Sequence, residues 1–253
     1  MKLFDLTGKV AVVTGGSKGI GRSICENLAE AGAKVVVSSR KLPACEEVVA
    51  GIKRAGGEAM AVPANISDKG SLEALIAATR KAWGKVDVLV CNAASNPYYG
   101  SMSGLGDEVF DKIMRNNVLS NLWLANLVLP EMVERKDGVI IIVSSIGGLR
   151  GTGVLGAYGI SKAADMALVR NLATEWGPHN IRVNAIAPGL IKTDFAKALW
   201  TNPEHLSRAE GQSPLRRIGL PDDIGGIAVM LAGKAGAFVT GQVIVADGGA
   251  TIV

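Results

Sequence analysis

Short apolar runs alternate along the chain with longer segments in which apolar residues recur every three or four positions. Seven of the short runs have the length of buried strands, at residues 9–13, 34–39, 58–62, 86–90, 138–143, 181–187 and 242–245. Helical periodicity occupies the segments between them, from about residue 43 and at residues 22–31, 67–83, 107–135, 158–176 and 221–231. This alternation predicts an α/β fold, a Rossmann-type doubly wound parallel sheet of about seven strands with helices on both faces.

The alternation continues to the end of the chain without an internal repeat, a linker or a shift in composition, so we expect one domain over residues 1–253. One stretch, residues 190–217, lacks strong periodicity and carries several large apolar side chains. A segment of this kind is typical of a mobile lid over a substrate pocket.

Composition and charge exclude several classes of protein. The net charge is +4, and the basic residues are scattered among acidic ones without an aromatic-basic surface, which argues against nucleic-acid binding. Three separated cysteines without a CxxC spacing, and a start unlike a signal peptide, indicate a reduced, cytoplasmic protein. His179 and His205 belong to no metal-ligand pattern, and no apolar run reaches the ~18 residues of a membrane span, so neither a metal nor a membrane is expected.

A glycine-rich turn joins the first strand to the first helix. Gly15, Gly19 and Gly21 in this turn would let the backbone approach a pyrophosphate and would direct helix N-terminal amides at it. An ordinary glycine turn is the alternative, but the strand before it and the helix after it are the context that dinucleotide binding requires. We therefore expect a nicotinamide dinucleotide as cofactor.

The end of the second strand bears on which dinucleotide is bound. An acidic residue there would accept hydrogen bonds from the ribose hydroxyls, whereas this strand ends in Ser39, Arg40 and Lys41, with Lys18 as a further cation in the glycine turn. These cations favour the 2′-phosphate of NADP(H) over NAD, although a solvated Arg-Lys pair at a strand end is also common.

Groups able to move a proton lie near the fifth strand. Ser145 follows that strand, and Tyr158 and Lys162 are four residues apart, on one face of the predicted helix. A neighbouring cation favours the phenolate form of a tyrosine, so this pair is suited to acid/base chemistry, although the spacing alone arises often by chance. Two adjacent amides, Asn116 and Asn117, interrupt the apolar face of residues 107–135 and indicate a local kink or a buried hydrogen-bonding role.

The order of these motifs resembles that of the short-chain dehydrogenase/reductase family, over residues 9–249. The resemblance implies that Tyr158 is the general acid, that Ser145 positions and polarises the carbonyl, and that Lys162 assists Tyr158 and binds the nicotinamide ribose. It further implies that Asn117 holds a water in a proton relay, and that a homotetramer forms through the two long helices. The catalytic candidates are thus Asn117, Ser145, Tyr158 and Lys162.

The turn, the strand ends and the resemblance together give a set of cofactor-binding candidates. They are Gly15, Ser17, Lys18, Gly19, Ile20, Gly21, Ser39, Arg40, Lys41, Asn65, Ile66, Asn92, Ala93, Ala94, Tyr158, Lys162, Pro188, Gly189, Ile191 and Thr193. The substrate-pocket candidates, which could equally be packing residues of the lid and of an interface, are Ser145, Tyr98, Leu155, Phe195, Leu199 and Trp200.

Two positions depart from the family pattern. Asn65 replaces the usual aspartate that contacts the adenine amine, and Ala94 replaces a glycine near the cofactor. Asn92 also has a purely structural interpretation, as the cap of a turn. None of these positions removes a catalytic group.

The expected function is an NADPH-dependent, reversible reduction of ketones or aldehydes, with hydride from nicotinamide C4 and a proton from Tyr158. The sequence looks most like the NADP-dependent carbonyl and retinal reductases of peroxisomal type, and the 3-oxoacyl-carrier-protein reductases share the same framework. The last residues, 251–253, do not form a peroxisomal address. The alternatives are an NAD-dependent secondary-alcohol or polyol dehydrogenase and a cofactor-sensing binding protein without turnover.

Overall fold

Seven parallel strands form one sheet in the computed structural model of the protein, which describes residues 2–253. The strands are β1 Val10–Thr14, β2 Lys34–Ser38, β3 Glu58–Ala61, β4 Val88–Cys91, β5 Gly138–Val143, β6 Ile181–Pro188 and β7 Val243–Ala246. Their order across the sheet is β3-β2-β1-β4-β5-β6-β7, so the direction of winding reverses between β1 and β4. In sheets of this kind, ligands bind outside the carboxyl ends of the strands at such a reversal.

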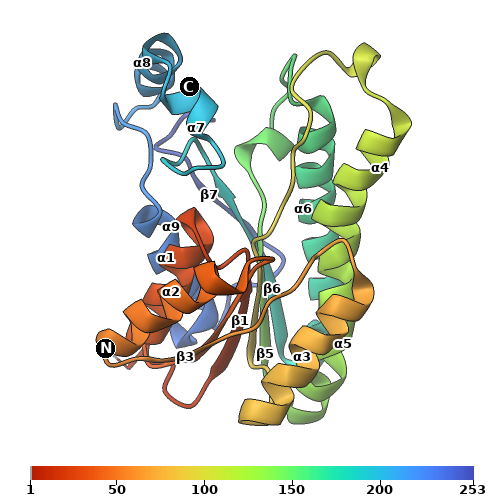
Figure 1. The fold of residues 1–253 in the computed structure, drawn as a ribbon, viewed down its shortest axis with the longest axis vertical. Helices are drawn as coiled ribbons and strands as arrows, with labels where there is room; N and C mark the ends of the chain where they lie inside the picture. Colours follow the sequence, from red (N-terminus) through yellow and green to blue (C-terminus); the bar gives the residue numbers. More distant parts are fainter. Residues whose placement is uncertain (1) are drawn as a thin grey trace.

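Helices cover both faces of the sheet, as Figure 1 shows. One layer contains α1 Gly19–Glu30, α2 Leu42–Arg54 and α9 Asp222–Ala232. The other contains α3 Lys69–Trp83, α4 Asp107–Met114, α5 Ser120–Arg135 and α6 Gly156–Trp176. The short helices α7 Lys197–Trp200 and α8 Pro203–Gln212 lie apart from both layers, at the top of Figure 1 near the C-terminus. The predicted fold class is confirmed.

The core consists of two apolar layers because successive strand residues point to opposite faces of the sheet. On β1, Ala11 and Val13 pack in one layer with α1 and α9, whereas Val12 packs in the other with residues of α3 and α5. All three are fully buried, as is usual for central parallel strands. This packing fixes the strand ends from which the functional residues project.

The segment predicted as a substrate-binding lid, residues 190–217, contains α7 and α8. Helix α8 is capped by Asn202, whose Oδ1 accepts hydrogen bonds from the amides of Glu204 (2.9 Å) and His205 (3.3 Å), and Pro203 occupies its first position. No residue of α8 is buried, so this helix lacks the apolar stripe from which helices are recognised in sequence. The weak periodicity of this segment therefore gave no indication of its two helices, and its role as a lid stays a prediction.

The long predicted helix at residues 107–135 is not continuous. A single π-helical turn, η2 Arg115–Leu119, separates α4 from α5 and contains the two adjacent amides. Short 3₁₀ segments complete the chain: η1 Met102–Gly104, η3 Ile146–Gly148, η4 Gly177–His179 and η5 Lys234–Gly236. Within residues 2–253, no helix combines the length and apolar character needed to cross a membrane.

The central position of β5 leads to a stability prediction. Ile140 on β5 is fully buried, so Ile140→Ala should lower the free energy of unfolding by about 2–5 kcal/mol through lost burial and a cavity. Ile252→Ala is the matched control, because that side chain is 84% exposed and should change stability little. Denaturant titration measures both, and equal effects would contradict this description of the core.

Candidate active site

The glycine turn forms a tight backbone cradle at the start of α1. Gly15 has φ +66°, a region that favours glycine, and a Cβ at Gly21 would clash with the carbonyl of Gly15 and lie 2.5 Å from Asn92 Nδ2. No side chain caps the N-terminus of α1, whose N-cap residue is Lys18. The amides of the first turn of α1 are therefore free to bind an anion, and the site fits the pyrophosphate of a dinucleotide.

Asn92, the residue directly after β4, stabilises the glycine turn by hydrogen bonds. Its Nδ2 donates hydrogen bonds to the carbonyls of Thr14 (2.9 Å) and Gly15 (3.2 Å), and its amide and that of Ala93 donate to Thr14 Oγ1. Asn92 thus braces the turn at the junction of β1 and β4, which agrees with the structural interpretation of this residue. Ala94 follows it along the same edge.

The three cations expected to bind the 2′-phosphate differ in whether they form an ion pair. Arg40 and Lys41 are exposed after β2, and within residues 2–253 neither forms an ion pair with a carboxylate. Lys18 instead pairs with Asp194 of the 190–217 segment, at 3.1 Å. Ser39 Oγ lies 3.1 Å from Cys45 Sγ, so it faces α2.

Asn65 forms a local turn after β3. Its Oδ1 accepts a hydrogen bond from the amide of Ser67 at 3.2 Å, and its own amide donates to Ser71 Oγ at 3.0 Å. The side-chain oxygen expected near adenine therefore already has one partner, whereas an aspartate would offer two oxygens. Ile66, the next residue, packs against the core layer that contains α3.

The end of β6 meets the glycine turn. The amide of Gly189 donates to the carbonyl of Ala246 at 3.0 Å, which ties the Pro188–Gly189 turn to β7. Ile191 is buried, and a Cβ at Gly19 would lie 2.9 Å from Thr193 Cγ2. Residues far apart in sequence thus converge on one edge, as expected for a cofactor site. Ser17 and Ile20 complete the turn, and the Ile20 side chain packs against the core.

Ser145 and Tyr158 flank the same point in space. A Cβ built on Gly147 would lie 3.4 Å from Ser145 Oγ and 3.8 Å from two ring carbons of Tyr158. Ser145 Oγ accepts a hydrogen bond from the amide of Gly147 at 3.0 Å, whereas Tyr158 is half-buried and its hydroxyl has no hydrogen-bond partner among the described residues. The Ser145 hydroxyl and the Tyr158 ring therefore both lie next to Gly147.

Lys162 lies beneath Tyr158. Its Nζ is 5.7 Å from the centre of the Tyr158 ring and donates to the carbonyl of Val143 (2.9 Å) and to Asp165 Oδ2 (3.0 Å). Burial opposes the charged form of Lys162, but the negative charges of Asp165 and Tyr158 outweigh it and raise the pKa of the ammonium. Lys162 is therefore a buried cation next to the proposed acid.

Asn117 occupies the π-turn and is completely buried. Its Oδ1 accepts from the amide of Ser95 (2.8 Å), and its Nδ2 donates to the carbonyl of Ser95 (3.0 Å) and to Ser161 Oγ (3.0 Å). The kink and the buried hydrogen bonds expected from the sequence are both present. They join the loop after β4 to the helix that carries Tyr158.

The substrate-pocket candidates are not all oriented toward Tyr158. The Phe195 ring is 6.2 Å from that of Tyr158, centre to centre, so this residue lies near the reactive group. Trp200 Nε1 donates to the carbonyl of Thr193 (2.8 Å), and the Tyr98 hydroxyl donates to the carbonyl of Ser101 (2.7 Å), so both polar groups are used within their own loops. Leu155, the N-cap residue of α6, and Leu199, within α7, are half-buried.

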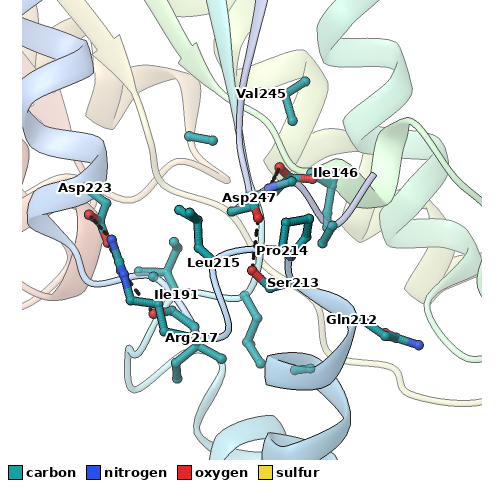
Figure 2. Close-up of a pocket in the computed structure, with 18 of the residues that line it drawn as sticks. Ile146, Ile191, Gln212, Ser213, Pro214, Leu215, Arg217, Asp223, Val245 and Asp247 are labelled. Atoms are coloured by element: carbon teal, nitrogen blue, oxygen red, sulfur yellow. Dashed lines mark hydrogen bonds and ion pairs between the residues drawn. The ribbon is translucent and has the colours of Figure 1, made fainter. Parts of the chain in front are cut away.

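A cavity of about 520 Å³ lies beside the site, between the 209–219 and 245–250 segments. Figure 2 shows its lining, which includes Ile146 and Ile191 but none of the substrate-pocket candidates. Its charged and hydroxyl groups are paired, since Arg217 binds Asp223 (2.6 and 2.8 Å) and Ser213 Oγ donates to the carbonyl of Gly248 (3.1 Å). The reactive groups are outside this cavity, which flanks the site without forming it.

Comparisons with known proteins agree with this arrangement. A family model described as enoyl-(acyl carrier protein) reductase matches residues 15–251. Dehydrogenase/reductase SDR family member 4 of Sus scrofa is 40% identical over 247 residues, covering 96% of this chain and 88% of that protein. The chain belongs to the short-chain dehydrogenase/reductase family. It is therefore an oxidoreductase that uses a nicotinamide cofactor and acts on a small molecule.

Solved structures of the family have the same fold and differ in cofactor. A 7α-hydroxysteroid dehydrogenase complexed with NADH and 7-oxo glycochenodeoxycholic acid is 38% identical, with a TM-score of 0.94, covering 98% of this chain and 96% of that chain. A putative NAD(P)-dependent gluconate 5-dehydrogenase of Beutenbergia cavernae with bound NADP is 33% identical, with a TM-score of 0.94, covering 99% of this chain and 100% of that chain. Family membership alone therefore does not select NAD or NADP.

Several residues next to the site were not predicted from the sequence. Asp165 binds Lys162, Asn121 binds Asp165, and Ser95 binds Asn117. The signal that could have revealed the first two is their spacing, since Asp165 follows Lys162 by three residues and Asn121 follows Asn117 by four. Ser95 gives no such signal, because a loop conformation brings it to Asn117.

The glycine cradle gives a prediction for cofactor binding. Gly21→Ala places a methyl group against the carbonyl of Gly15, so we expect the dissociation constant for NADP(H) to rise at least about tenfold. Fluorescence titration with NADPH measures this effect. Gly226→Ala in α9 is the control, since a Cβ there meets nothing within 4 Å, and similar affinity loss in both variants would contradict a specific role for the cradle.

Proposed function

We propose that this short-chain dehydrogenase/reductase is an NADPH-dependent reductase of ketones or aldehydes that also runs in the reverse direction. The observation that supports it most directly is that the Ser145 hydroxyl and the Tyr158 ring both lie next to Gly147, with the buried Lys162 ammonium 5.7 Å from the centre of that ring. This arrangement offers a hydrogen-bond donor, a proton donor and a fixed positive charge to a single oxygen atom.

The hydrogen bonds of the two hydroxyl groups indicate their roles. Ser145 Oγ accepts from the amide of Gly147, which leaves its own hydrogen free to donate to a carbonyl oxygen and polarise it. The Tyr158 hydroxyl has no acceptor among residues 2–253, so its proton is available to the developing alkoxide. When bound, NADPH supplies the hydride from nicotinamide C4 to the carbonyl carbon.

Lys162 has two functions in this mechanism, one toward Tyr158 and one toward the cofactor. The ammonium, held charged in the interior, stabilises the phenolate that remains after Tyr158 gives up its proton. Two of its three hydrogens are donated to Val143 and Asp165, and the third is left for a ribose hydroxyl of the cofactor. Asn117 is hydrogen-bonded to Ser95 and to Ser161. It thereby joins the π-turn before α5 to α6, the helix that carries Lys162.

The preference for NADP(H) is supported by the free cations after β2. Arg40 and Lys41 are exposed and without carboxylate partners in the described part of the chain, as a 2′-phosphate site requires. A second candidate is an NAD-dependent secondary-alcohol dehydrogenase. It is favoured by the pairing of Lys18 with Asp194, which commits one of the expected cations, and by the NADH-containing 7α-hydroxysteroid dehydrogenase structure.

Cofactor choice can be decided by initial rates with NADPH and NADH on a simple diketone. Arg40→Ala should lower kcat/KM for NADPH by about 10- to 100-fold and leave that for NADH nearly unchanged, because only the 2′-phosphate loses a charged hydrogen bond. Arg54→Ala, at the far end of α2, is the matched control and should have little effect. A higher kcat/KM with NADH in the unmodified protein would favour the dehydrogenase alternative.

Removal of one oxygen atom tests the proton donor. Tyr158→Phe should keep NADPH affinity and lower kcat by about 10²- to 10⁴-fold, because the general acid is lost while the cofactor cradle is intact. Tyr99→Phe, at a side chain 61% exposed, is the control and should retain full turnover. Retained activity in Tyr158→Phe would refute the assignment.

A further inference from the structure

A second ionisable residue is enclosed next to Lys162. Asp165 lies on α6, one turn after Lys162, and its side chain is fully buried. Its Oδ2 accepts from Lys162 Nζ at 3.0 Å, and its Oδ1 accepts from Asn121 Nδ2 at 2.9 Å. Both oxygens therefore bind protein groups, and complete burial closes the carboxylate to a ligand.

The same network reaches the π-turn. Asn121 Nδ2 also donates to the carbonyl of Asn117, at 2.6 Å, so its two amide hydrogens join that carbonyl to the Asp165 carboxylate. A chain of direct hydrogen bonds thus runs from Asn117 through Asn121 and Asp165 to Lys162. It fixes the position of the ammonium relative to α5 without requiring a bridging water.

We propose that Asp165 is a positioning residue that keeps the buried Lys162 ammonium charged and aligned under Tyr158. The inference rests on the roles given to Tyr158 and Lys162 in the proposed function. Asp165 acts only through Lys162, because its two oxygens are occupied and the protein encloses it. It completes the reactive set as the counter-charge of the lysine.

The physical argument is the desolvation of the ammonium. Lys162 is only 2% exposed, and a buried ammonium without a counter-charge loses its proton readily. Burial also raises the pKa of the Asp165 carboxyl, while Lys162 and Asn121 oppose that effect by stabilising the carboxylate. The pair is thus held charged by mutual contact and by the hydrogen bonds around it.

The other groups facing this pair do not supply the missing charge. From β4, burial raises the pKa of the Cys91 thiol, so it remains neutral. From β5, Val143 contributes a carbonyl, and from α5, Asn121 contributes an amide. From α6 itself, the ring of Tyr158 lies 5.7 Å from the Lys162 ammonium, measured to the ring centre.

Asp165→Asn tests the inference without cofactor or substrate. Ionisation of Tyr158 is followed with pH by the ultraviolet absorbance of the phenolate. For each protein, the absorbance of the same protein carrying Tyr158→Phe is subtracted, so that only Tyr158 contributes. In Asp165→Asn, Lys162 loses its proton at lower pH and no longer stabilises the phenolate, so we expect a midpoint at least about one pH unit higher. Glu175→Gln, which removes an exposed carboxylate from the same helix, should leave the midpoint unchanged.

An unchanged midpoint would overturn the inference and leave Asp165 with a purely structural role. A lower midpoint would also overturn it, because Lys162 would then stay charged without Asp165. Asn121→Leu gives an independent test if Asp165→Asn does not fold, since losing one donor to Asp165 should raise the midpoint by a smaller amount. If the unmodified protein reduces no carbonyl compound, the proposed function fails, whereas the titration still decides the role of Asp165.

Discussion

Parallel pairing of the central strands is the constraint on which the rest of the structure depends. Because β1, β4, β5 and β6 run in the same direction, their carboxyl ends meet at one edge, and β1, β4 and β5 each place a polar residue there. Asn92 connects two of these ends by hydrogen bonds to the carbonyls of Thr14 and Gly15. The cradle and the reactive groups therefore share one rigid frame.

Most of the fold could be predicted from the sequence because buried strands and amphipathic helices leave strong patterns. The glycine turn, Ser145, Tyr158 and Lys162 were recognisable because their types and order are constrained by the chemistry. Helix α8 was not, since none of its residues is fully buried and its start is marked only by the Asn202 cap and Pro203. Patterns of burial carry no information about a helix that buries no side chain.

The parts of the site that depend on tertiary contacts also escaped prediction. The role of Asp165 is decided by the environment of its two oxygens, which are satisfied by Lys162 and Asn121 from different helices. Similarly, the polar atoms of the large residues Trp200 and Tyr98 donate to carbonyls a few residues away in the chain. Sequence gives the residue type at such a position, whereas the direction of the side chain follows from packing.

The ion pair between Lys18 and Asp194 limits how firmly the 190–217 segment is held against the glycine turn. Both side chains are 69% exposed, and an exposed pair of this kind contributes at most about 1 kcal/mol. That energy corresponds to a population ratio of only about five to one, and dissolved salt reduces it further. Thermal motion can therefore break this ion pair. The pair adds little electrostatic resistance when a dinucleotide enters or leaves the site at the glycine turn.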